Sequence, residues 1–311
     1  MTTESMFDSI AVIGPTASGK TNLAVSLAHQ LNGEILSVDS RMVFKGMDIG
    51  TGKDLDSYYY QGKPIPYHLI DICEPSENYN IHRFQTDFKK AFHLVRTEKK
   101  LPILCGGSGL YLEAVINDFA YTSVPTNIIR RAELETLTLE ELNNILNGFP
   151  YHDFLKLADP TSHKRAVRAI EIMEYLMANP SFALPISEPI KPFVIGINPS
   201  TSLRWQRINN RLEQRLNNGL IEEIVQMRQL GITKERLIFF GLEYKYVLNY
   251  LEEKWSKEKL FEELSIAIRQ FSKRQMTYFR KMEKGGLHIH WVEEANEVFS
   301  ILPEQFTQIK N

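Results

Sequence analysis

The first 120 residues alternate short apolar runs with longer patterns of helical period. The short runs predict buried strands, and the longer patterns between them predict amphipathic helices. The expected strands are residues 10–13, 34–38, 67–72 and 101–105, and the expected helices are residues 21–31 and 81–100. Strands that alternate with helices of this length predict a parallel sheet that is covered by helices on both faces.

The pattern changes after residue 120, where polar helical segments and breakers replace the strands. Helices are expected over 134–146 and 162–177, a proline-marked loop over 178–192, and a last strand over 193–197. Nearly everything after Ser200 has helical periodicity. We therefore expect an α/β protein in three parts. A P-loop sheet core covers residues 1–120, and a small helical insertion covers residues 121–162. Residues 163–311 supply the rest of the core, including the strand near 193–197, and the C-terminal helices.

Composition sets limits rather than a function. Hydrophobic residues make up 43% of the 311-residue chain and charged residues 24%, which excludes a disordered or coiled-coil protein. The formal net charge of −2 excludes a general attraction to nucleic acid and leaves room for a local basic patch. Cys73 and Cys105 are too few for a disulfide framework, and no apolar stretch reaches the about 20 residues of a membrane span. We expect a cytoplasmic protein with no membrane contact.

A phosphate-binding loop directly follows the first predicted strand. Residues 14–21 read Gly-Pro-Thr-Ala-Ser-Gly-Lys-Thr, which is the pattern G-x-x-x-x-G-K-[ST] between a strand and a helix. Backbone N–H groups and the helix dipole suit phosphate, Lys20 adds a positive charge, and the Thr21 hydroxyl is a ligand for Mg²⁺. The predicted phosphate-binding residues are Gly14, Thr16, Ala17, Ser18, Gly19, Lys20 and Thr21.

Asp39 ends the second predicted strand. Ligands of open α/β sheets bind beyond the carboxyl ends of the strands, so this carboxylate is expected near the phosphate loop. Three roles are open from the residues alone: a cap for the following turn, a catalytic base, or a carboxylate linked to a metal.

Two later segments concentrate basic residues at helical spacing. The first has four arginines on one helix face without an obvious carboxylate partner on that face: Arg204, Arg207, Arg211 and Arg215. The second mixes basic and aromatic residues over 269–284, a combination that suits phosphate contact and base stacking. A solvated helix face remains the alternative for both segments.

Several motifs in order resemble the tRNA dimethylallyltransferase (tRNA isopentenyltransferase) family. They are the phosphate loop, Val38-Asp-Ser40, Gly46-Met-Asp-Ile-Gly-Thr51, Gly106-Gly-Ser-Gly-Leu-Tyr111 and Lys273-Arg-Gln-Met-Thr-Tyr-Phe-Arg280. Together with their flanks they span residues 10 to about 291. The family transfers a dimethylallyl group from its diphosphate to the exocyclic amine of the adenine just 3′ of the anticodon. The resemblance thus implies a P-loop core that binds dimethylallyl diphosphate, Mg²⁺ and the tRNA anticodon arm; we expect a monomer.

The resemblance also implies roles for individual residues. Asp39 is the implied base for the amine proton, and Arg211, with Arg207 second, is the implied arginine at the diphosphate. The implied catalytic residues are Asp39, Lys20, Thr21 and Arg211. The implied tRNA-binding residues are Asp39, Ser40, Arg41, Met42, Ser108, Lys164, Arg165, Arg168, Arg269, Lys273, Arg274 and Arg280.

The chain departs from the family pattern at a few positions. Ser108 stands where the family usually has Thr, which keeps a hydroxyl for the substrate contact. Met42 stands where the family often has Gln, and Phe44 where it usually has Tyr. Where the family often reads G-Y-R/K, this chain offers Tyr244 and Lys245 one or two residues later. The predicted insertion, which helps the family grip the anticodon arm, is short.

Three other functions compete with this hypothesis. A nucleotide or small-molecule kinase uses the same loop and predicts ATP hydrolysis or phosphate transfer. An isopentenyltransferase for free adenylate predicts no need of the basic C-terminal helix. A P-loop RNA-binding protein without catalysis predicts tRNA binding without turnover.

Overall fold

The computed structural model describes residues 6–185 and 189–307, and the chain divides into two compact units. The first unit comprises Met1–Asp118 and Pro189–Asn311, and the second comprises Phe119–Glu188. Residues 186–188 of the predicted loop 178–192 lie outside the described residues. In the described ranges, no helix combines the length and the apolar character needed to cross a membrane.

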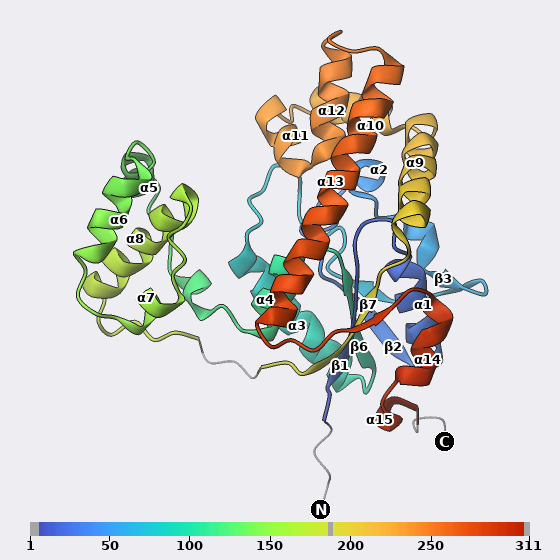
Figure 1. The fold of residues 1–311 in the computed structure, drawn as a ribbon, viewed down its shortest axis with the longest axis horizontal. Helices are drawn as coiled ribbons and strands as arrows, with labels where there is room; N and C mark the ends of the chain where they lie inside the picture. The colour runs from blue at the N-terminus through green and yellow to red at the C-terminus, as the bar shows by residue number, and fades with distance from the viewer. Residues whose placement is uncertain (1–5, 186–188, 308–311) are drawn as a thin grey trace, which may run out of the picture. The chain divides into compact units, whose positions relative to one another are not determined.

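The first unit is built on a six-stranded sheet in which all paired strands run parallel, in the order β5-β2-β6-β1-β7-β8 (Figure 1). In the central strand, Ile10 pairs with Ile103 on one side and Phe193 on the other. This position buries the strand on both faces, so its apolar residues run consecutively. The strands are β1 (Ser9–Ile13), β2 (Gly33–Ser37), β5 (Tyr67–His68), β6 (Leu101–Gly106), β7 (Pro192–Ile197) and β8 (His290–Val292).

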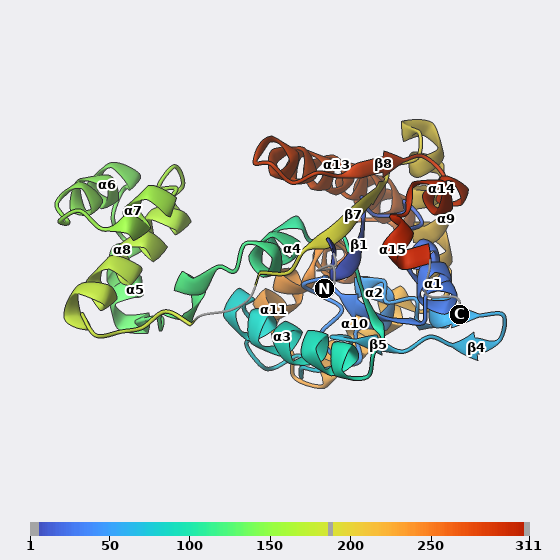
Figure 2. The same cartoon turned by 90° about the horizontal axis from the view of Figure 1, so that it is seen from below.

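Helices cover both faces of this sheet, as the alternating pattern predicts (Figure 2). Ala11 and Ile13 belong to one buried apolar cluster, and Ile10 and Val12 belong to another. The helices of the unit are α1 (Lys20–Gln30), α2 (Asp48–Thr51), α3 (Ile81–Thr97), α4 (Gly109–Ile116), α9 (Thr201–Asn217), α10 (Leu220–Gln229), α11 (Lys234–Phe240), α12 (Leu242–Leu251), α13 (Lys257–Lys284), α14 (Val298–Ile301) and α15 (Glu304–Thr307). Short 3₁₀ turns, η1 (Leu55–Tyr58) and η3 (Ala295–Glu297), and a hairpin of β3 (Tyr59–Tyr60) with β4 (Lys63–Pro64) complete it. The predicted α/β fold class is confirmed.

The predicted strand over 67–72 is wrong in length. Strand β5 ends at His68, because Leu69 (φ 65°) and Asp71 (φ 56°) adopt the left-handed backbone conformation, which interrupts an extended chain. The segment was apolar enough to suggest a longer strand: Leu69 and Ile70 are both buried. Burial in a loop and burial in a strand give the same local pattern here.

Residues 119–188 form a helical unit with a core of its own. Its elements are η2 (Ala120–Ser123), α5 (Ile128–Leu134), α6 (Leu139–Asn147), α7 (Asp153–Leu157) and α8 (His163–Ala178). Leu142 on α6 and Ile170 on α8 are fully buried in this core. The boundary expected at residue 162 is therefore wrong: α8 belongs to the insertion, because α5 and α6 bury their apolar faces against it.

The helix expected over 134–146 is divided between α5 and α6. The Thr138 hydroxyl accepts from the Glu141 N–H at 3.3 Å, and the Glu141 carboxylate accepts from the Thr138 N–H at 2.7 Å. This reciprocal pair is a capping box, and it starts a new helix at Leu139.

Candidate active site

The phosphate loop lies between the carboxyl end of β1 and the first turn of α1. Its backbone is left-handed at Ala17 (φ 60°) and Gly19 (φ 96°). A Cβ on Gly14 would come within 2.7 Å of the Ser18 Oγ, so the loop closes tightly only with glycine there. The Ser18 hydroxyl is buried and has no hydrogen-bond partner among the described residues. A buried hydroxyl left open in a loop of this shape suits a phosphate oxygen.

Lys20 carries the positive charge of the loop. Burial lowers the pKa of its ammonium, and the nearby charge of Arg211 lowers it further. Cys105, Asp39 and Asp54 act in the opposite direction and raise it. A half-buried cation near another cation gains from an anionic ligand, so these electrostatics favour a bound diphosphate.

A cavity of about 560 Å³ brings the phosphate loop together with the other predicted site segments. Its wall includes the loop, the turn after β2, the turn after β6, and parts of α9 and α13. The predicted site residues that line it are Thr16, Lys20, Thr21, Asp39, Ser40, Arg41, Met42, Ser108, Arg211 and Arg274. A second cavity, of about 1240 Å³, shares Lys20, Thr21 and Arg211 with it, and is also lined by Ala17, Ser18, Gly19 and Arg207.

Asp39 is both a turn cap and a cavity residue. Its Oδ1 accepts from the Arg41 N–H at 2.9 Å, and the neighbouring Ser40 N–H donates to the Ser108 hydroxyl at 3.2 Å. These two bonds fix the carboxylate in the cavity wall. Its Oδ2 has no hydrogen-bond partner within the described ranges. The predicted cap is therefore present, and one oxygen stays available for a proton or a cation.

The surroundings of Thr21 fit Mg²⁺ only together with a substrate. Among residues 6–185 and 189–307, no group of three or more histidine, cysteine, aspartate or glutamate side chains could hold a metal. Burial raises the pKa of the adjacent Cys105 thiol to about 11, so a neutral thiol faces Thr21 and does not compete for the ion. Mg²⁺ is commonly held by few protein oxygens plus substrate phosphates and water. The Thr21 hydroxyl and nearby Asp39 fit that donor set.

Two arginines of helix α9, Arg207 and Arg211, reach the phosphate loop and the loop after α2. The Arg207 Nη1 donates to the Ser18 carbonyl at 3.1 Å. The Arg211 Nη2 donates to the Gly52 carbonyl at 3.1 Å and pairs with the Asp54 carboxylate. Burial lowers the pKa of Arg211 to about 10, with a further contribution from the positive charge of Arg215. The diphosphate role of both arginines stays a prediction.

Carboxylate partners for this helix come from other elements. Arg215 lies 3.7 Å from Asp54 and 3.5 Å from Glu243. Burial raises the pKa of Glu243, and the Arg215 charge opposes this effect. Arg215 is therefore engaged within the protein, and its carboxylate partners could not be found from spacing within the helix.

Gln275 on α13 connects two loops of the site and was missed in the sequence. Its Oε1 accepts from the Thr16 N–H at 2.8 Å, and its Nε2 donates to the Gly107 carbonyl at 2.9 Å. One buried amide thus holds the phosphate loop and the turn after β6 against α13. Its place inside the motif Lys273–Arg280 was the available signal.

Glu223 on α10 organises the glycine-rich loop and was also missed. Its carboxylate accepts from the N–H groups of Asp48, Ile49 and Gly50 at 2.8, 2.7 and 3.0 Å, and from the Tyr244 hydroxyl at 2.8 Å. A Cβ on Gly50 would come within 2.6 Å of the Tyr244 ring, so only glycine fits at this position. Glu223 therefore fixes the segment that leads to Gly52, the partner of Arg211.

The variant Glu223→Gln is expected to lower the free energy of unfolding by about 2–3 kcal/mol, because a buried charged acceptor of several hydrogen bonds is lost. Chemical denaturation measures this change. Glu222→Gln is the matched control, since Glu222 is the exposed neighbour on the same helix. Equal stabilities of the two variants would show that the carboxylate of Glu223 does not hold the loop.

Lys53 anchors the far end of the same loop. It is almost fully buried, and its Nζ donates to the Phe44 carbonyl and the Asp48 carboxylate, both at 2.7 Å, and to the Asp71 carboxylate. The glycine-rich loop is therefore folded around a buried lysine, whose charge is compensated by two carboxylates.

The predicted tRNA-facing residues of α13 lack acidic partners. In the part of the chain that the structure describes, no ion pair involves Arg269, Lys273, Arg274, Arg280, Lys281 or Lys284. Several cations lie over aromatic rings instead: Arg269 and Lys273 over Trp205, and Arg274 over Phe271. Phe271 is 40% exposed. An uncompensated basic face with exposed aromatic rings suits a nucleic acid.

The predicted tRNA-facing residues of the insertion differ in how they are engaged. Lys164 is exposed, whereas Arg165 pairs with Asp159. The Arg168 Nη2 donates to the Val124 carbonyl at 2.6 Å, so this guanidinium is used within the helical unit. A tRNA contact of these three residues stays a prediction.

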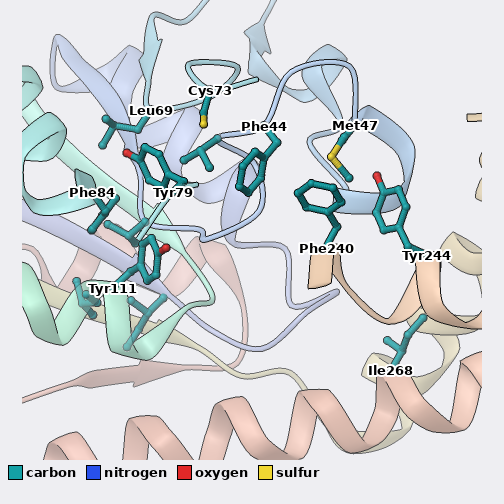
Figure 3. Close-up of a cluster of buried hydrophobic side chains, with 14 of the residues drawn as sticks. Phe44, Met47, Leu69, Cys73, Tyr79, Phe84, Tyr111, Phe240, Tyr244 and Ile268 are labelled. Atoms are coloured by element: carbon teal, nitrogen blue, oxygen red, sulfur yellow. The ribbon is translucent and has the colours of Figure 1, made fainter. Parts of the chain in front are cut away.

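Two departures from the family pattern lie in the core rather than at the surface (Figure 3). Phe44 is fully buried, with its ring 4.8 Å from that of Phe240. Tyr244 is also fully buried and bound to Glu223, so it does not serve as a tRNA contact, while Lys245 is exposed at the cavity. Met42 lines the cavity.

The chain is similar to known proteins over most of its length. The family model described as IPP transferase matches residues 42–282. The chain is 44% identical to tRNA dimethylallyltransferase 1 of Azobacteroides pseudotrichonymphae over 94% of this chain and 97% of the relative, and 45% identical to tRNA dimethylallyltransferase 2 of Bacteroides fragilis over 93% and 94%. The crystal structure of the full-length tRNA isopentenylpyrophosphate transferase from Bacillus halodurans matches with a TM-score of 0.67 and 28% identity, covering 97% of this chain and 98% of that one. On this family match and these relatives, the chain belongs to the IPP transferase family of tRNA dimethylallyltransferases.

Proposed function

We propose that this chain transfers a dimethylallyl group from dimethylallyl diphosphate to the N6 amine of the adenosine 3′ of the anticodon in tRNA, with release of diphosphate. The observation that carries the proposal is the 560 Å³ cavity, whose wall joins Lys20 and Thr21 of the phosphate loop to the Asp39 carboxylate and Arg211. The residues proposed to bind the diphosphate and the residue proposed as the base for the amine thus line the same cavity.

The chemistry follows from this arrangement. The adenine nitrogen forms a bond to the allylic carbon, while the bond from that carbon to the diphosphate oxygen breaks. Asp39 accepts the proton that the amine loses, through its open Oδ2. The negative charge that develops on the leaving diphosphate is met by loop N–H groups, Lys20 and Arg211, which are held in place beforehand.

We also propose Mg²⁺ as the cofactor. The Thr21 hydroxyl would hold it together with diphosphate oxygens, at the wall of the same cavity. When bound, the ion neutralises charge on the diphosphate. Lys20 and Arg211 orient the diphosphate from the protein side.

The tRNA is proposed to lie along α13, where the basic residues without acidic partners meet the cavity at Arg274 and Gln275. An adenine inside a nucleic acid must leave its stack to enter a cavity of this kind. Exposed rings at the cavity, including Phe239 and Phe271, offer stacking surfaces for unstacked bases. The monomeric state and the cytoplasmic location stay predictions.

A single assay tests the function. The purified chain is incubated with Mg²⁺, dimethylallyl diphosphate and an unmodified tRNA that has adenosine 3′ of the anticodon, and N6-prenylated adenosine is expected in the digested RNA by mass spectrometry. The same tRNA with guanosine at that position is the control and should give no product. Faster prenylation of AMP, phosphate transfer from ATP, or tRNA binding without any product would each overturn the proposal in favour of a different function.

A further inference from the structure

Asp54 is the carboxylate partner of Arg211, the arginine proposed to bind the diphosphate. Its Oδ2 pairs with the Arg211 Nη2, and its Oδ1 lies 3.7 Å from the Arg215 Nη2. Burial lowers the pKa of Arg211 and the charge of Arg215 lowers it further, whereas Asp54 acts in the opposite direction. A carboxylate of the chain itself therefore compensates the two cations that stand closest to one another on this face of α9.

Asp54 is accessible from a cavity that the phosphate loop also lines. The cavity of about 1240 Å³ has Asp54 in its wall together with Lys20, Thr21 and Arg211. Burial lowers the pKa of Lys20, and Asp54 is among the charges that oppose this effect. The negative charge of Asp54 thus acts on both cations that are proposed to hold the diphosphate.

Two carboxylates neighbour these arginines, and they differ in exposure. The side chain of Glu243, which lies 3.5 Å from Arg215, is 17% exposed, and that of Asp54 is 45% exposed. Water can solvate the Asp54 carboxylate when it leaves the guanidinium, so this ion pair opens at little cost. The backbone of Asp54 is fixed separately, because its carbonyl accepts from the Ser57 N–H at 2.8 Å. Only the side chain has to turn.

We propose that Asp54 competes with the diphosphate group for Arg211, and that it thereby limits how tightly the donor is held and speeds the release of the product diphosphate. The proposal rests on the proposed function for the assignment of Arg211 to the diphosphate. A diphosphate carries several negative charges, so it still displaces a single carboxylate from the guanidinium. When the product leaves, the carboxylate returns and compensates the arginine again. Product release is a slow step in many enzymes, and a competitor of this kind shortens it.

The test measures the affinity of the full chain for inorganic diphosphate by calorimetry, once with Mg²⁺ and once with EDTA. Asp54→Asn keeps the shape of the side chain and an oxygen for Arg211, but it removes the competing charge. The variant is expected to bind diphosphate about three- to tenfold more tightly than wild type in both conditions, because a partly exposed ion pair and a nearby like charge are both lost. Its release of diphosphate in a stopped-flow displacement experiment should be slower by a similar factor.

Asp56→Asn is the matched control. Asp56 is exposed, lies two residues later in the chain and lines the same cavity of about 1240 Å³. Within the described ranges, the carboxylate partners of Arg211 and Arg215 are Asp54 and Glu243. Asp56→Asn should therefore keep the diphosphate affinity of wild type. Equal gains in both variants would show a general effect of negative charge at the cavity and contradict a competition by Asp54.

Two other roles of Asp54 predict weaker binding in the variant. A carboxylate that orients Arg211 for the diphosphate predicts weaker binding with Mg²⁺ and with EDTA. A carboxylate that holds Mg²⁺ beside Thr21 predicts weaker binding with Mg²⁺ alone. Either result, or an unchanged affinity, overturns the proposal. Asp54→Gly suits the left-handed backbone at this position (φ 46°) and should show the same gain, so the outcome does not depend on the introduced amide.

The binding of inorganic diphosphate is measured without prenyl transfer, so the two proposals fail separately. A wild-type chain that binds diphosphate but forms no prenylated adenosine contradicts the proposed function and leaves the comparison of the variants readable. A chain that prenylates tRNA, but whose Asp54→Asn variant binds diphosphate no more tightly, contradicts only the competition. In an active chain, Asp54→Asn should also lower the KM for dimethylallyl diphosphate, by about the same factor as the gain in diphosphate affinity.

Discussion

Asp39→Asn is expected to lower kcat by about 10²–10⁴-fold, the usual loss when a general base is removed. The amide keeps the shape of the side chain and an oxygen for the Arg41 N–H, so the turn after β2 should remain. What is lost is the basicity of Oδ2, which has no partner in the described residues and lies in the cavity wall. The affinity for dimethylallyl diphosphate should barely change, because the carboxylate is assigned to the amine.

Three measurements on this variant distinguish the three roles of Asp39. A base predicts a low kcat with normal diphosphate affinity and normal Tm. A turn cap predicts a loss of about 1 kcal/mol in stability with kcat retained in the folded fraction. A metal-linked carboxylate predicts weaker diphosphate binding that added Mg²⁺ partly restores. A normal kcat of the Asp39→Asn variant would contradict the proposed mechanism, in which Asp39 is the base.

The sheet could be predicted because its strands are buried on both faces. Residues 10–13 and 101–105 read as continuous apolar runs, and in the structure they pair directly as β1 and β6. The loops that end these strands carry the glycines and hydroxyls of the site, so the motif and the fold supported each other. The pattern failed where burial was not accompanied by regular structure, as at the buried Leu69, whose left-handed conformation leaves no trace in hydrophobicity.

The boundary of the insertion could not be predicted, because α8 has an amphipathic pattern that fits either unit. Only contacts between distant segments decide, such as the salt bridge from Arg131 on α5 to the buried Glu171 on α8. The basic residues on α8 made it look like a tRNA surface. Arg168 shows that a cation on a predicted exposed face can instead bind a backbone carbonyl of its own unit.

The residues that carry charge in the site were easier to find than those that position them. Lys20, Asp39 and Arg211 belong to motifs or regular spacings, and all three line the cavity. Glu223 binds backbone N–H groups that lie more than 170 residues away in the chain. Gln275 binds one that lies 259 residues away. Such partners are set by tertiary packing, so a single sequence gives no signal for them beyond their place near a motif.

Removal of the positive charge of the phosphate loop is the other change with a large expected effect. Lys20→Ala should reduce kcat by about 10²–10³-fold, since a preorganised charge that stabilises the leaving diphosphate is lost. Lys90→Ala, which removes an exposed lysine on α3, is the matched control and should keep the wild-type rate. Binding of tRNA should persist in both variants, because neither lysine is among the predicted tRNA contacts.

Thr21→Ala tests the proposed Mg²⁺ ligand of the same loop. The dependence of its rate on Mg²⁺ concentration should differ from that of Lys20→Ala. The hydroxyl is assigned to Mg²⁺, so the variant should need a higher Mg²⁺ concentration for half-maximal rate, with kcat reduced by about 10²-fold at low Mg²⁺. Lys20→Ala should show no such rescue, because the Thr21 hydroxyl remains to hold Mg²⁺ and the charge that is lost is that of the ammonium. Thr21→Ser restores the hydroxyl and should restore the rate. If Lys20→Ala and Thr21→Ala both kept normal rates at all Mg²⁺ concentrations, the diphosphate would have to bind elsewhere, and the basic face of α9 would be the first place to look for it.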